Sequence, residues 1–172
     1  MPDNKIEGVY PPFFEKYISL VENEEMTSIL EKQAKKAVDF FSSIPQEKWS
    51  YKYAENKWTV KEVLQHITDT ERVFSFRALA FSRKDPHTFP SFDENEYASN
   101  SNANNKTVDA LIEEFLAVRK STQFLFDGFS SDQLNYSGKA STYEMTVKSI
   151  GYMIAGHFAH HMKILKEKYF PG

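Results

Sequence analysis

The stretch TVKEVLQHITDTERVFSFRALAFSR, residues 59–83, decides the fold class. It opens with a capping-box sequence, in which the Thr59 hydroxyl and the Glu62 carboxylate satisfy exposed backbone N–H groups at a helix start. Apolar residues then recur at three- and four-residue steps, which is the pattern of one face of a helix. The Asp-Pro pair at 85–86 ends the pattern, because proline disfavours helix in the residue before it. We therefore predict a helix over residues 59–83.

The same periodicity predicts three further amphipathic helices, over residues 24–44, 107–126 and 146–169. Each is about 20 residues long, and no convincing strand lies between them. The sequence therefore predicts an all-α four-helix bundle, formed by residues 1–172 as a single domain.

The connection between the second and third predicted helices is long, KDPHTFPSFDENEYASNSNANN, residues 84–105. Connections longer than about 12–15 residues without secondary structure are uncommon and are usually functional or disordered. This one is either a tolerated surface loop or a lid. Its length also lets the two flanking helices run parallel, and we expect it to cap one end of the bundle.

Composition excludes several classes of function. Net charge is −3, from 21 basic and 24 acidic residues, and no basic patch stands out, so nucleic acid is not an expected partner. The chain has no cysteine, which excludes disulfides, cysteine metal ligands and cysteine nucleophiles. No apolar run approaches the ~18 residues needed to cross a bilayer. We expect a soluble, cytoplasmic protein without a membrane partner.

Histidines of the fourth predicted helix, in the segment GHFAHHMKIL, carry the most specific chemistry. His157 and His161 are one helical turn apart and continue the apolar stripe, whereas His160 lies at its edge. Side chains at i and i+4 have Cβ atoms ~5–6 Å apart, so these two imidazoles can converge on one metal ion. The alternative is a pair of core histidines satisfied by hydroxyls or water, since burying an unpaired imidazole costs free energy.

His66 borders the inward face of the second predicted helix, and in a helix bundle metal ligands come from facing helices. Three imidazoles with an open fourth position are typical of a catalytic rather than a structural site. A bound divalent ion would lower the pKa of a water in that position towards ~7. Taken alone, His66 is more simply explained as a core or boundary histidine.

Other candidates surround these histidines. Arg77 either binds an anionic substrate or pairs with a buried carboxylate. Asp69 either holds the far nitrogen of a ligand histidine or is a solvated helix charge. Gln33 is a candidate donor near the site, or lies at a wet end of the bundle. Glu71 faces away from His66, so no glutamate is an obvious general base, and this lack favours thiol transfer over hydrolysis.

The chain resembles the DinB-like superfamily of bacterial metal-binding four-helix bundles over most of its length. The segments that carry the resemblance are KYISLV (16–21), YAENKWTVKEVLQHITDTERVFSFRALAFSR (53–83), FPSFDENEY (89–97), LIEEFLAVRKST (111–122) and IAGHFAHHMKILKEKYF (154–170). The resemblance implies one divalent ion bound by His66, His157 and His161, with Zn or Ni expected ahead of Fe or Mn. Members are frequently dimers, which implies a homodimer.

The resemblance does not fix one reaction, because the family includes thiol S-transferases, a thiol-dependent isomerase and proteins described as metal-dependent hydrolases. The leading expectation is the bacillithiol-transferase-like branch: a metal-dependent S-transferase that joins a low-molecular-weight thiol to a small-molecule substrate. A coordinated thiol loses its proton, and without cysteine in the chain the sulfur must come from a cosubstrate. The alternatives are a hydrolase with a metal-activated water and a non-enzymatic, stress-associated metal-binding protein.

Overall fold

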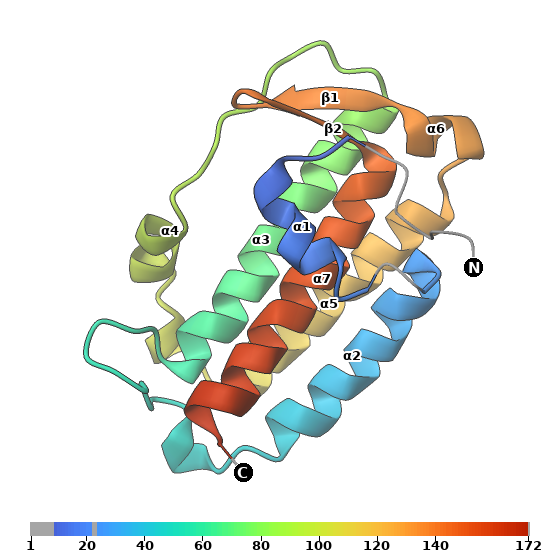
Figure 1. Ribbon diagram of the computed structural model, residues 1–172. Coiled ribbons are helices and arrows are strands. Elements are labelled where there is room, and N and C mark those ends of the chain that lie inside the picture. The colour runs from blue at the N-terminus through green and yellow to red at the C-terminus, as the bar shows by residue number, and fades with distance from the viewer. Residues whose placement is uncertain (1–8, 22–23, 172) are drawn as a thin grey trace.

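The computed structural model describes residues 9–21 and 24–171 and forms the expected four-helix bundle (Figure 1). The long helices are α2 (Met26–Ser42), α3 (Val60–Ser82), α5 (Val108–Asp127) and α7 (Val147–Ile164), and a π-helix, η4 (Leu165–Tyr169), continues α7. The short elements are η1 (Pro12–Phe14), α1 (Glu15–Ile18), η2 (Gln46–Lys48), α4 (Glu94–Asn100), η3 (Ala103–Asn105), α6 (Ser131–Asn135), β1 (Ser137–Ala140) and β2 (Tyr143–Thr146).

Helix starts follow from local side-chain chemistry. At α3 the Thr59 Oγ1 accepts from the Glu62 backbone N–H, and the Glu62 carboxylate accepts from the Thr59 N–H. The capping box is therefore present as predicted. Thr107 and Thr146 cap α5 and α7 through their side chains in the same way.

Helices α3 and α5 run parallel to each other. Lys61, at the start of α3, donates to the backbone oxygen of Lys106, just before α5. Towards the other end of both helices, the Ser75 and Thr122 hydroxyls lie 3.0 Å apart. A parallel pair requires a connection that returns the length of the bundle, which the long segment before α5 provides.

That connection does not cap an end of the bundle as we had expected. It descends along α3 and carries α4 and η3 on its way back to the start of that helix (Figure 1). Asn104, near its end, accepts a hydrogen bond from the Thr59 hydroxyl. The expectation failed because α5 is parallel to α3 and therefore begins at the end of the bundle where α3 begins. A connection that only capped the far end of α3 would not bring the chain back to that point.

A two-stranded antiparallel hairpin, β1–β2, precedes α7, where we expected no strand. Ser137 pairs with Thr146, and Ala140 pairs with Tyr143. Ser141 turns the hairpin with a positive φ of 56°. Strands of four residues are too short to give a periodic signal in the sequence.

Two clusters of buried apolar side chains fill the bundle, and a layer of buried polar groups lies between them. One cluster includes Phe81 and Met153, and the other includes Trp49 and Phe158. On α3 the polar layer includes His66, Thr70 and Glu71, and on α7 it includes His157, two residues after Ala155. Among the described helices, none is long and apolar enough to cross a membrane.

Candidate metal centre

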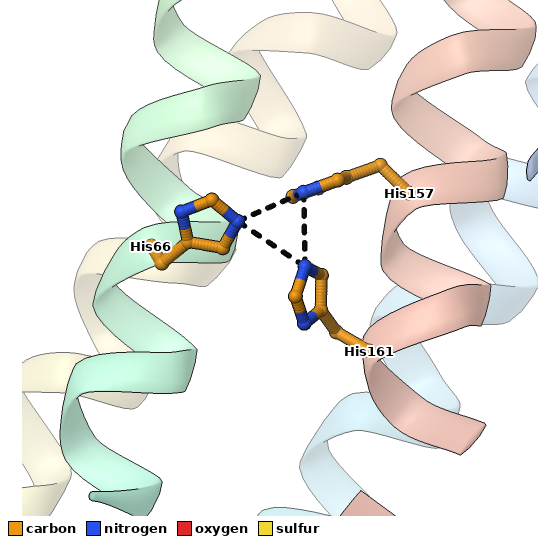
Figure 2. Close-up of side chains that lie close together, drawn as sticks. All are labelled: His66, His157 and His161. Carbon is orange, nitrogen blue, oxygen red and sulfur yellow. Dashed lines mark hydrogen bonds between the residues drawn. The ribbon is translucent and has the colours of Figure 1, made fainter. Parts of the chain in front are cut away.

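Three histidines converge in the polar layer (Figure 2). His66 projects from α3, and His157 and His161 project from successive turns of α7. The Nε2 atom of His66 lies 2.9 Å from that of His157 and 3.2 Å from that of His161, and the third side of the triangle is 3.1 Å. The sequence reasoning placed these three residues on inward faces, and the structure brings them together.

Hydrogen bonding alone cannot satisfy this triangle. A neutral imidazole carries one N–H, so each Nε2 is either a donor or an acceptor. An Nε2–H can point well at only one of the other two nitrogens. Of the three Nε2 pairs, at least one then consists of two donors or two acceptors and cannot form a hydrogen bond. A cation that accepts all three lone pairs removes the conflict, and tetrahedral M–N bonds of ~2.0–2.1 Å imply N···N distances of about 3.3 Å. The residues present therefore fit a divalent metal ion.

The protonation state of the imidazoles also suits a metal. Burial lowers the pKa of His66 to about 4. Burial also lowers the pKa of His157 and of His161 well below the usual value, and the neighbouring histidines add to both effects. All three are therefore neutral at pH 7, with their lone pairs available as ligands.

Aromatic rings hold the imidazoles from two sides. The Trp58 ring, just before α3, packs against His66 with centroids 4.6 Å apart. On the other side, Tyr17 of α1 contacts both His157 and His160, at 6.0 and 4.7 Å. His160 thus contacts this tyrosine and lies outside the Nε2 triangle.

A buried ion pair belongs to the same polar layer as the histidines. Arg119 of α5 donates three hydrogen bonds to the Glu71 carboxylate, at 2.8–3.0 Å, and the two side chains are 1% and 2% exposed. Arg119 also donates to Gln33 Oε1, and Gln33 Nε2 donates to the Ala155 carbonyl, two residues before His157. Gln33 therefore links α2, α5 and α7, and no hydrogen bond joins it to a histidine in the described part of the chain.

Asp69 and Arg77, the other residues named from the sequence, also lie away from the triangle. Asp69 accepts from Gln65 and Arg72 at the α3–α5 interface, and within the described chain no hydrogen bond joins it to a histidine. Arg77 is two turns beyond the polar layer and donates to the Pro90 carbonyl. Neither residue orients a ligand imidazole.

Two cavities reach the triangle. One, of about 370 Å³, reaches His157, and the other, of about 220 Å³, reaches His161. Glu94, at the start of α4, lines both. Sequence reasoning missed Glu94 and Tyr17, although both lie in segments that carry the family resemblance, because neither belongs to one of the long periodic helices.

Comparison with known proteins agrees with this architecture. The family model of the DinB superfamily matches residues 29–165. Among solved structures, the chain is similar to YfiT from Bacillus subtilis, with a TM-score of 0.66 and 14% identity over 83% of this chain and 85% of that one. YfiT is described as a probable metal-dependent hydrolase with an unusual four-helix bundle topology. No curated protein matches the chain. From the extent of the family match, the chain belongs to the DinB superfamily.

Proposed function

We propose that the protein is a metal-dependent enzyme in which His66, His157 and His161 hold one divalent ion. The observation that carries the proposal is the triangle of three converging Nε2 atoms, whose lone pairs hydrogen bonds alone cannot satisfy. A set of imidazoles without a carboxylate favours Zn or Ni ahead of Fe or Mn. When bound, such an ion supplies a Lewis acid that lowers the pKa of a coordinated thiol or water.

Within that class, thiol S-transfer is the leading reaction. It needs room for two substrates, and the two cavities that reach the triangle supply it. The smaller cavity carries polar groups of Asn56 and Lys57, which suits a hydrophilic small thiol. The thiol loses its proton, its sulfur forms a bond to an electrophilic carbon of the second substrate, and the leaving group departs with its electron pair. The chain's part is to hold the two substrates next to the histidines, one in each cavity.

Hydrolysis is the second candidate, and Glu94 is the observation that favours it. Glu94 belongs to the walls of both cavities, and we assign to its carboxylate the role of taking a proton from an attacking water. Glu71 is not available for this role, because Arg119 binds both of its oxygens.

Metal content per chain tests the ligand set. Mass spectrometry should find about one divalent ion per chain in the wild type. It should find a strong loss in His66→Ala, His157→Ala and His161→Ala. The matched control is His87→Ala, since His87 is exposed in the long connection and pairs only with Asp85. Stoichiometric metal in all three variants of the triangle would refute the site.

Spectroscopy and turnover then separate the reactions. In cobalt-substituted protein, titration with bacillithiol, glutathione or cysteine should produce a sulfur-to-cobalt charge-transfer band if a small thiol is the cosubstrate. Metal-dependent turnover of activated esters without that band would favour the hydrolase, and Glu94→Gln should then lower the rate. Metal binding with neither signal would leave the non-enzymatic, stress-associated metal-binding protein.

We also propose that the protein acts as a cytoplasmic homodimer, as its family resemblance implies. Phe76 and Leu79 of α3 and Phe124 of α5 are exposed apolar side chains that a partner could cover. Light scattering of the purified protein measures this directly: a monomer at micromolar concentration would contradict the dimer.

A further inference from the structure

The larger cavity combines an apolar wall with one cation. Phe14, Phe74 and Phe92 supply aromatic surface, and His157 lies at its edge. Arg77 is the single cation among the described lining residues, and Glu94 is the single carboxylate. Its volume, about 370 Å³, falls at the small end of the range for ligand pockets, ~300–1,000 Å³.

Arg77 has the surroundings of a binding residue. Its side chain is 7% exposed, and its guanidinium lies over the rings of Phe74 and Phe92, at 5.7 and 5.9 Å. Its Nη2 donates to the Pro90 carbonyl at 2.7 Å, and within the described chain no carboxylate forms an ion pair with it. Buried arginines are normally paired with an anion, since the uncompensated charge is costly. Arg119, in the same bundle, has such a partner in Glu71.

Thr70 is a second unsatisfied group in the same wall. It lies one turn after His66 on α3 and is 3% exposed. Its Oγ1 is the buried side-chain polar atom that lacks a hydrogen-bond partner among the described residues. A buried hydroxyl normally has a hydrogen-bond partner, so the missing partner of Thr70 points to a ligand. Along α3 the cavity wall thus carries Thr70, one turn after His66, and then Arg77, whose Cα lies about 10 Å further along the helix axis.

We propose that this cavity binds a small, largely apolar substrate that carries a carboxylate, with the carboxylate on Arg77 and the reactive end towards His157. One guanidinium matches a monoanion, whereas a phosphate dianion would need a second cation. The exposed Glu94 makes no ion pair with Arg77, so the guanidinium is free to take the ligand's anion. That the bound molecule is the substrate rests on the function proposed above, whereas the carboxylate contact does not.

Calorimetry with a matched acid and amide tests the contact in the wild-type protein. The probes are 3-phenylpropanoate and 3-phenylpropanamide, which have the same shape and differ in charge. The acid should bind at least about ten-fold more tightly, because hydrogen bonds to a charged group are the stronger ones. Equal affinities, or no binding of either probe up to millimolar concentration, would overturn the proposal.

Two variants localise the effect. In Arg77→Met the preference for the acid should disappear while the amide still binds, and in Thr70→Val the acid should bind several-fold more weakly. The control is Arg83→Met, which removes an exposed cation from the end of the same helix and should preserve the preference. Equal weakening of acid and amide in Arg77→Met would indicate a structural role instead and would overturn the assignment.

Metal-free and zinc-loaded protein are both titrated, which separates this proposal from the preceding one. Suppose that the preference for the acid depends on Arg77 in both the metal-free and the zinc-loaded protein, and that the histidine variants still retain metal. The carboxylate site would then be supported and the metal site refuted. Metal lost in the histidine variants, with no preference for the acid, would do the reverse.

Discussion

Removing one partner of the buried Glu71–Arg119 pair should destabilise the protein severely. Glu71→Gln keeps the side-chain shape but leaves the Arg119 guanidinium, 1% exposed, without its anion. Breaking a buried pair in this way costs about 3–5 kcal/mol. That is a large part of a total stability of about 5–15 kcal/mol, and for a chain of this size it lowers Tm by roughly 6–20 °C.

Urea unfolding in the presence of EDTA measures this cost without a contribution from metal. The matched control is Glu113→Gln on α5, an exposed glutamate whose loss should change stability by less than about 0.5 kcal/mol. Glu71→Gln combined with Arg119→Met should recover part of the loss, with about 1–3 kcal/mol still missing because Gln33 loses its donor. A Glu71→Gln cost below about 1 kcal/mol would refute the reasoning.

The remaining predictions concern pH, packing and capping. The folded pKa of His66 is about 4, below its unfolded value, so the metal-free protein should keep this contribution above pH 6.5 and lose it as the pH falls. Urea unfolding at pH 7 and pH 5 should differ by about 2 kcal/mol from this residue, and equal stabilities would contradict the shift. Gly156→Ala should cost about 1–3 kcal/mol in thermal unfolding, because its Cβ would clash with the Tyr17 backbone carbonyl; an unchanged Tm would show that α1 does not approach so closely. Thr59→Ala should cost about 1–2 kcal/mol in the same urea assay, since Thr59 caps α3 and also bonds Asn104.

The helices and the ligand triangle were predictable because strong local signals specify them. Long apolar periodicity located α2, α3, α5 and α7 to within a few residues at most ends, and Thr59 with Glu62 marked the start of α3. His157 and His161 share a face at the spacing of one helical turn. Their convergence with His66 then followed from bundle geometry, in which facing helices supply the ligands.

Features set by contacts between distant segments were not predictable. The partner of Glu71 is Arg119, 48 residues away, and nothing in either local sequence names the other. Gln33 bonds to residues of other helices, and Asp69 bonds to a residue one turn away on its own helix. A helical wheel shows the face on which a residue lies, but it does not show which of these partners the residue meets. The path of residues 84–105 depended on the parallel direction of α3 and α5, which only the folded chain reveals.

The two kinds of segment around the metal centre have different tolerance to change. The three histidines stand on the long helices α3 and α7, which are connected through Glu71, Arg119 and Gln33. By contrast, much of the larger cavity's wall comes from short pieces outside the bundle: α1, residues 90–94 and the β1–β2 hairpin. A combinatorial library restricted to those pieces, with Tyr17 kept, would therefore change which molecules enter the cavity while leaving the triangle intact. For protein engineering, the specificity of the cavity could thus be changed separately from the three histidines.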